Sequence, residues 1–523
     1  MNDCLLPGPA LTPLIFDILS RFRFHKVALI GDLEKAFLNI EINPEERSLL
    51  RVLWIDDINS TNPEVITLRF TRLVFGLVCS PFILNVTLRN HLSKYENTDP
   101  SFVDTVVSAL YVDDFASGKD SAKDGFELYR KLKLCFGEGD FNMGKWASNS
   151  QELTELIKKE EAAILATPKP FPEVTLASKS NVVEGGSSNN AVNEETLIKV
   201  MGVPWDRIED NLKFDLTTFA GQALEGTLTQ RKLLSTTAQF YDPLGLLSPV
   251  TLPLKCMFQE ICRLKIDWDE ALSEDLTSRW KELFEDMERV SSIALPSCIL
   301  DEIEVGDIKS IQLHGFADAS KYAFGANVYI KVMTSNACSS HLLASKTRVE
   351  PLSGETIPRL ELMAALTLAN LMTVVYEALV HTVEVDGVFN WTDSQIVWWW
   401  ITGESTQFKQ FVQNRVQKIR RLWKKEHWRY CPSELNPADI ASREAKSSVI
   451  ASSELWWKGA PFLKKEEFDW PSLPNCQAGG TAVPEEALRE LKQESSSEIS
   501  RVMTDSISAK FSEHLRSHPT RKI

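Results

Sequence analysis

An apolar run of β-forming residues, VDTVVSALYV (residues 103–112), ends at two adjacent aspartates, Asp113 and Asp114. Apolar β-formers followed by polar turn residues predict a strand that enters a tight hairpin. Two carboxylates at one turn repel each other unless water or a cation offsets their charge. The pattern therefore leaves two interpretations open: a solvated acidic turn, or a turn that binds metal ions.

A third carboxylate bears on this choice. Asp32 closes an earlier strand-like run, VALIGD. If the two strands are neighbours in one sheet, Asp32, Asp113 and Asp114 meet at one end of it. Such a set can hold two divalent ions about 3.5–4 Å apart, which activate a hydroxyl group and stabilise a leaving pyrophosphate. Carboxylate oxygens are ligands that suit Mg²⁺.

The composition is that of a globular protein with several domains: 523 residues, 43% hydrophobic and 25% charged. The net charge of −15 argues mildly against nucleic-acid binding, although a local basic cleft remains compatible with it. The nine cysteines are scattered, without a CxxC pair or zinc-ligand spacing, which indicates a reducing compartment. Neither a signal peptide nor a long apolar run is found, so no membrane partner is expected and the cytoplasm is the expected location.

Local patterns divide the chain into parts. Residues 1–215 alternate strand-like and helix-like segments and include a Gly/Ser/Asn-rich stretch, at about 168–195, that predicts a mobile loop. Residues 216–304 are mostly helical, and 305–446 combine a hairpin, a long helix and a further strand. Residues 447–523 form a tail that is expected to be partly disordered. The predicted fold class is α/β and multidomain.

A second set of acids lies in residues 305–446. Asp318 lies in the strand-like HGFADAS, Glu361 in the helical PRLELMAAL, Asp393 at the end of VFNWTD, and Asp439 in LNPADIASR. Each has an ordinary alternative: Glu361 as a surface helix residue, or Asp393 as a helix N-cap. Four acids at strand ends and helix starts, in this order, favour a second metal site.

The N-terminal motifs resemble those of a known family. NDCLLPGPALTPLIFDILSRFRFHKVALIGDLEKAFLNIEI, LRFTRLVFGLVCSPFILNVTLRNHL, ALYVDDFASG and FNMGKWASNS are similar, in order, to the motifs of reverse transcriptases of the Pao/BEL group of LTR retrotransposons. The resemblance implies an α+β palm at 1–215, which extends a DNA primer on an RNA template from dNTPs.

The resemblance also assigns roles by position. Asp32, Asp113 and Asp114 match the metal-binding aspartates, and Phe37 matches the bulky residue that meets a ribose 2′-hydroxyl. Lys145 matches a lysine near the triphosphate, a general acid for pyrophosphate. The short KVMGVPWD segment resembles the primer-grip hairpin. The FGLVCSP loop, which lies beneath template and nucleotide in the family, supplies Phe75, Gly76, Ser80 and Pro81.

The second set of acids resembles the Asp-Glu-Asp-Asp set of a ribonuclease H: Asp318, Glu361, Asp393 and Asp439. This implies a five-stranded mixed sheet flanked by helices, with two Mg²⁺ (or Mn²⁺) ions that activate water against the RNA of an RNA–DNA hybrid. Many ribonucleases H carry a histidine shortly before the last aspartate, where this chain has Arg429.

The remaining segments are less specific. STTAQFYDPLGLLSPVTLPLKCMFQEI resembles the thumb and connection of Pao-type elements (216–304), and SELWWKGAPFL resembles a segment leading toward an integrase. The basic run KQFVQNRVQKIRRLWKKEHWRY is either a solvated helix face or a phosphate grip for the hybrid. The triplet Trp398–Trp400 is expected to pack in a core.

Together these patterns predict part of a retrotransposon Pol polyprotein. The alternative is a decayed or domesticated nucleic-acid-binding protein without activity. The intact acids favour retained chemistry. In the family, a basic fingers segment precedes NDCLLPGP, whereas Met1 begins at that point here, so a truncated palm with weak polymerase activity is expected. The oligomeric state stays open.

Overall fold

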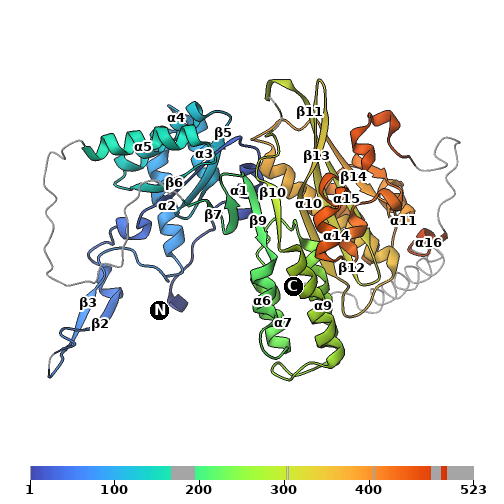
Figure 1. The fold of residues 1–523 in the computed structure, drawn as a ribbon, viewed down its shortest axis with the longest axis horizontal. Coiled ribbons are helices and arrows are strands. Elements are labelled where there is room, and N and C mark those ends of the chain that lie inside the picture. Colours follow the sequence, from blue (N-terminus) through green and yellow to red (C-terminus); the bar gives the residue numbers. More distant parts are fainter. Residues whose placement is uncertain are drawn as a thin grey trace, which may run out of the picture.

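The computed structural model of the chain describes residues 2–59, 61–166, 195–301, 303, 305–404, 407–472 and 485–491. These residues form three packed units, each built around its own sheet (Figure 1). The linker expected at 168–195 lies outside the described residues except for Glu195, and so does most of the tail beyond residue 472.

The first unit is a four-stranded sheet in the order β4-β5-β1-β6 with helices packed on it. A ribbon of β2 and β3 projects from this unit and is largely exposed (Figure 1). The elements are η1 (Asn2–Cys4), α1 (Ile15–Phe22), β1 (Val27–Leu33), η2 (Ala36–Asn39), η3 (Arg47–Leu49), β2 (Arg51–Ile55), β3 (Val65–Arg69), α2 (Ser80–Leu92), η4 (Ser93–Tyr95), α3 (Pro100–Ala109), β4 (Leu110–Tyr111), β5 (Asp114–Lys119), α4 (Ala122–Glu138), β6 (Met143–Ala147) and α5 (Gln151–Ala166).

The structure corrects the strand predicted for residues 103–112, because most of that run is the helix α3. Asp99 caps this helix by accepting a hydrogen bond from the backbone N–H of Phe102 at 3.1 Å, and Pro100 lies in its first turn. Its buried residues, Phe102, Val103, Val106 and Ala109, recur at helical spacing. Capping and amphipathic spacing thus override the β propensity of the valines, and only the last two residues before the turn pair as a strand.

The second unit combines a four-stranded antiparallel sheet, in the order β10-β9-β8-β7, with four helices. The sheet uses strands from both sides of residue 215, so the boundary expected there divides one structural unit. The elements are β7 (Leu197–Val200), β8 (Val203–Asp206), β9 (Asn211–Asp215), α6 (Leu216–Leu224), α7 (Gln230–Gln239), α8 (Ser248–Leu264), α9 (Glu274–Val290) and β10 (Ser292–Pro296).

The third unit is a five-stranded mixed sheet in the order β13-β12-β11-β14-β15. β11, β12 and β13 pair antiparallel, whereas β14 is parallel to both β11 and β15. The elements are η5 (Val305–Asp307), β11 (Ile308–Ala319), β12 (Ala323–Thr334), β13 (Cys338–Val349), α10 (Ile357–Leu379), β14 (Gly387–Thr392), α11 (Gln395–Thr402), α12 (Gln410–Leu422), η6 (Lys425–His427), β15 (Trp428–Tyr430), η7 (Ser433–Leu435) and α13 (Ala438–Ser442). This arrangement matches the mixed sheet expected from the sequence.

The long helix α10 packs on β11 and β12 and fills the core on one face of this sheet. Within the described residues it is the one helix whose length and hydropathy would allow it to cross a membrane. Twelve of its residues are buried in the protein, so its apolar composition is that of a core helix.

The segment that follows α13 covers the other face of the sheet, so residues 447–472 are not a loose tail. Tyr329 donates its hydroxyl to the carbonyl of Trp456 at 2.8 Å, and Lys331 donates to the carbonyl of Lys465 at 3.1 Å. Trp470 packs edge-on against the buried ring of Trp391. The elements are α14 (Ser447–Ser452), α15 (Glu454–Lys458), η8 (Pro461–Lys464) and η9 (Glu467–Asp469), with α16 (Glu485–Leu488) beyond them.

The DPLGLLSP motif (242–249) joins the second and third units. Asp242 turns the chain by accepting backbone hydrogen bonds from Leu246 at 2.9 Å and Leu247 at 2.7 Å. Burial raises the pKa of this carboxyl to about 6. The turn places the start of α8 against the edge strand β13.

Gly245 is the point of closest approach between these units. Its φ is +71°, and a Cβ added there would overlap the carbonyl oxygen of Ser345 in β13. The N–H of Ser345 donates to the carbonyl of Leu244 at 2.9 Å, and the hydroxyls of Ser248 and Ser345 lie 2.6 Å apart. The junction is therefore a backbone contact that only glycine permits.

Gly245→Ala should destabilise the protein more than Gly226→Ala. Gly226 has the same φ of +71° but open space around its Cβ position, so its substitution should cost only the left-handed backbone penalty, about 1–2 kcal/mol. Gly245→Ala should cost about 1–3 kcal/mol more, because the methyl group also pushes on β13. Urea unfolding of both variants, followed by tryptophan fluorescence, measures the difference. Equal costs would contradict this account of the junction.

Candidate active sites

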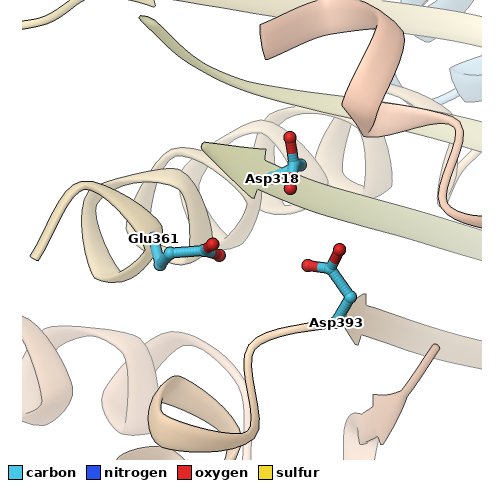
Figure 2. A group of neighbouring side chains, drawn as sticks. All are labelled: Asp318, Glu361 and Asp393. Atoms are coloured by element: carbon cyan, nitrogen blue, oxygen red, sulfur yellow. The ribbon is translucent and has the colours of Figure 1, made fainter. Parts of the chain in front are cut away.

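Three acids of the third unit come together at one end of its sheet. Ala317 of β11 pairs in parallel register with Thr392 of β14, so Asp318 and Asp393, the next residues, lie side by side. Glu361 comes from the second turn of α10, which crosses that end of the sheet. Figure 2 shows the three side chains converging, and one ligand oxygen from each lies within 4.8 Å of the others.

Burial makes this cluster electrostatically costly. Asp318 is only 5% exposed, and burial, followed by the charge of Asp393, raises its pKa to about 7. The same causes raise the pKa of Glu361 well above its usual value, and burial raises the pKa of Asp393. Three neighbouring carboxylates that resist ionisation are stabilised when cations bind between them.

Two oxygens of the cluster lack a hydrogen-bond partner and are available as ligands of a cation. Within the described part of the chain, Glu361 Oε2 and Asp393 Oδ1 are buried and make no hydrogen bond with a protein group. Buried polar atoms are normally satisfied, so an orphaned pair facing a third carboxylate indicates a ligand site. An all-oxygen, anionic donor set suits Mg²⁺ or Mn²⁺.

The fourth predicted acid, Asp439, lies beside the cluster and is paired with Arg443. It begins the short helix α13, and its Oδ1 accepts a hydrogen bond from Arg443 Nε at 2.6 Å. Its charge nevertheless raises the pKa of both Asp318 and Asp393, so it faces the same region. The structure therefore brings three of the four acids together, and the fourth forms an ion pair with Arg443.

Sequence analysis did not identify Ser442, which holds α13 against the cluster. Its buried hydroxyl donates to Asp318 Oδ2 in a short hydrogen bond. Ser320 donates to the carbonyl of Ser442 at 2.7 Å, and Asn436 Nδ2 donates to the carbonyl of Ala317 at 3.1 Å. A serine three residues after an aspartate carries no signal of such a role, because the partner is distant in the sequence.

Much of the basic run at 409–430 is structural. Arg420 donates to three carbonyls at the end of α11, Arg415 stacks on Phe411 at 3.5 Å, and Arg429 pairs with Glu467 at 3.5 Å. Three of its cations thus have partners within the protein, and the phosphate grip stays a prediction for the other cations of the run. Trp400 is fully buried, as the packing interpretation of the tryptophan triplet requires.

The first unit brings its predicted acids together at the β1–β5 pair. Asp32 is directly opposite Asp114, and the N–H of Leu33 donates to the carbonyl of Asp113 at 2.9 Å. Between Tyr111 and Asp113, Val112 has a φ of +59°, a strained conformation for a β-branched residue. Strain of this kind is concentrated at functional turns.

Lys145 supplies a positive charge to this site. Its ammonium binds Asp32 Oδ2 at 2.6 Å, and this hydrogen bond raises its own pKa. Burial is the main cause of the raised pKa values of Asp113 and Asp114, with Asp32 adding repulsion to both. Among the described residues, no three carboxylates here are as close as those of the third unit.

The β7–β8 hairpin, where the sequence resembles a primer grip, lies next to this site. A cavity of about 400 Å³ is lined by Asp32, Asp114 and Lys145 on one side and by Lys199 and Met201 of the hairpin on the other.

The residues assigned to nucleotide contacts lie in η2, in the loop before α2 and at the start of α2. Phe37 is buried, and its ring meets that of the exposed Phe75 edge-on at 4.7 Å. Gly76 has a φ of +86° with open space around it. The Ser80 hydroxyl donates to the carbonyl of Val74 at 2.7 Å where α2 begins, and Pro81 occupies the first turn of that helix. Phe37 is thus covered by Phe75.

Cation binding should stabilise the third unit in a pH-dependent way. An unfolded aspartate has a pKa near 3.9, whereas that of folded Asp318 is about 7, so the folded state holds the proton more tightly. Stability therefore falls as the pH rises from about 4 to about 7. Saturating Ca²⁺ should offset this loss and raise Tm by about 5 °C or more at pH 8, but little at pH 5.

The control for this measurement is Glu384→Gln, which removes an exposed carboxylate at the opposite end of β14. It should keep the Ca²⁺ response, whereas Asp318→Asn should lose most of it. An equal response at both pH values would contradict a cation site at the buried acids.

Comparisons with known proteins agree with part of this picture. Residues 229–394 match the family model of the Pao retrotransposon-like RNaseH-like domain. No curated protein matches the chain.

Two solved structures of foamy viral protease-reverse transcriptase are similar. One is in complex with double-stranded DNA (12% identity, TM-score 0.48, 83% of this chain and 61% of that chain), and one is with an RNA/DNA hybrid (11%, 0.45, 84% and 48%). This chain thus spans less than two thirds of either. The family match runs from Thr229, the N-cap of α7, to the residue after Asp393, so this segment of the chain is similar to a Pao retrotransposon-like RNaseH-like domain.

Proposed function

We propose that the chain is part of a retrotransposon Pol polyprotein whose third unit hydrolyses the RNA strand of RNA–DNA hybrids. The observation that carries the proposal is the buried group of Asp318, Glu361 and Asp393, with oxygens within 4.8 Å of one another and two of them unpartnered. The Pao-type family match over residues 229–394 supports the same reaction class.

The roles of the residues follow from their positions. Asp318, Glu361 and Asp393 would hold two Mg²⁺ or Mn²⁺ ions, and Asp439 would join them once Arg443 releases it. Bound divalent ions lower the pKa of water and offset charge at a phosphodiester. Ser442 fixes the carboxylate of Asp318, because it donates its hydroxyl from α13, which packs on β11 and β12. The site is preorganised by packing before substrate arrives.

Asp393→Asn should abolish hybrid cleavage while leaving the fold intact. The amide keeps the shape but removes a negative ligand, and loss of a metal ligand should reduce activity by at least about 100-fold. The measurement is Mg²⁺-dependent cleavage of the labelled RNA strand of a hybrid, using the full chain. Glu384→Gln makes the same chemical change outside the site and should retain full activity.

The same assay separates this proposal from the alternative of a non-enzymatic nucleic-acid-binding protein. A folded protein that binds hybrid but cleaves none of it, with Mg²⁺ or Mn²⁺ at any salt concentration, would favour the alternative.

A second activity is proposed for the first unit: RNA-templated extension of a DNA primer with dNTPs. The register of Asp32 opposite Asp114, the strained turn at Val112, and the cavity shared with the β7–β8 hairpin support it. Lys145, bound to Asp32, is placed to donate a proton to the leaving pyrophosphate. This residue also neutralises the site, so a metal must displace it before the acids act as ligands.

Phe37→Ala should raise the incorporation of ribonucleotides relative to deoxyribonucleotides by roughly 10-fold or more, because it removes bulk that meets a 2′-hydroxyl. Primer extension with each nucleotide set measures the ratio. Leu134→Ala is the control, since it removes an exposed apolar side chain of α4 that does not line the cavity beside the acids, and it should leave the ratio unchanged. Absence of extension by the unsubstituted chain would contradict this second activity.

A further inference from the structure

A large cavity lies where the three units meet, away from both sets of acids. Its volume is about 950 Å³, and none of the seven predicted acids lines it. One wall is α8 of the second unit, another is formed by α10 and α12, and the edge strand β13 runs between them. Residues just before and within α1 close one end. We call this cavity the junction groove.

The junction groove concentrates positive charge in an acidic protein. Five cations line it, and its one carboxylate, Asp242, is buried and bound to backbone N–H groups. The cations are Lys255, Lys346, Arg348, Arg415 and Lys418. Within the described residues, no carboxylate forms a salt bridge with Lys346, Arg348 or Lys418, all three of which are exposed. In a chain of net charge −15, such a group creates a local field that attracts anions.

The position of the groove relates it to the acids of the third unit. Lys255 lines the junction groove, and the next residue of α8, Cys256, lines a second cavity of about 860 Å³. That second cavity contains Lys321 and Arg443 and reaches Ser320, two residues after Asp318. Its lining also includes Arg263, Arg279, Glu260 and Glu444, and Arg279 pairs with Glu260 at 2.9 Å, so four cations and two carboxylates line the space between the groove and Ser320.

The walls also offer apolar surface beside the cations. Phe16, Phe240 and Met363 are partly exposed in the groove. Cations that bind phosphates, together with rings on which bases stack, are the features of single-strand binding sites. A volume of about 950 Å³ gives room for a short segment of one strand.

We propose that the junction groove binds a single-stranded segment of nucleic acid through its phosphates and leads it toward or away from the acids of the third unit. The proposal rests on the proposed hybrid cleavage for its biological role. The binding itself depends only on the groove.

The test is binding of a fluorescein-labelled oligothymidylate of about 12 nucleotides, measured by anisotropy in EDTA. The full chain should bind it, and the affinity should fall with salt. In Lys346→Ala/Arg348→Ala, two phosphate contacts are lost, so the slope of log affinity against log salt should become shallower by about 1.4. Lys123→Ala/Lys281→Ala removes two exposed lysines outside the groove and should leave affinity and slope unchanged.

Three binding results would overturn the proposal. An unchanged slope in the groove variant, with an unchanged Tm that shows intact folding, places binding elsewhere. Displacement of the oligonucleotide by pyrophosphate at an equal phosphate concentration indicates a small-anion site, and preferential binding of polyglutamate indicates an acidic peptide site. Hybrid cleavage is measured in parallel. If the unsubstituted chain does not cleave the hybrid, the proposed function is contradicted but the groove is not. If the groove variant cleaves the hybrid and binds the oligonucleotide as the unsubstituted chain does, the groove alone is contradicted.

Discussion

The parallel pairing of β11 with β14 is the constraint on which the site of the third unit depends. It aligns Ala317 with Thr392, so the next residue of each strand is an aspartate at the same edge of the sheet. α10 packs across that edge because its apolar face covers β11 and β12, and this packing brings Glu361 to the pair. The stability gained from the core thereby offsets the repulsion among three buried carboxylates. A fold that separated these strands would remove the repulsion and the site together.

The negative charge of the two sets of acids is offset in different ways. In the first unit, Lys145 neutralises Asp32 at 2.6 Å, so the site carries its own cation. In the third unit, the nearest arginine, Arg443, binds the peripheral Asp439 and leaves the inner three acids without a basic partner among the described residues. The charge of the inner cluster is therefore offset by protons or by cations from solution, whereas that of the first site is offset in part by its own lysine. This difference is the physical reason for placing hydrolysis by the third unit ahead of polymerisation.

Features that depend on the local sequence pattern could be predicted from the sequence. Features that depend on contacts between residues far apart in the chain could not. The helix α10 and the strands that carry Asp318 and Asp393 follow from periodicity and polar punctuation, whereas the five-stranded mixed sheet was implied by the resemblance to ribonuclease H. α3 was predicted as a strand, because the propensity of its valines outweighed the cap at Asp99 and the helical spacing of the buried residues. Ser442 and Gly245 carry no local signal, since their partners, Asp318 and Ser345, are about a hundred residues away. The boundary at 215 failed for the same reason: β10 returns to pair with β9.

The junction between the second and third units explains why a family pattern spans both. The match over residues 229–394 begins in α7 and ends beside Asp393, so it includes the DPLGLLSP turn, the edge strand that receives it, and the three inner acids. Gly245 can pack on Ser345 only if both units are folded, and Trp456, which donates its ring N–H to the carbonyl of Leu246 at 3.0 Å, ties the C-terminal segment to the same turn. Docking also creates the junction groove, because its cations come from α8, β13 and α12 and meet only when these elements are packed together. A contact that stabilises the fold thus also brings the positive charge of two units into one groove.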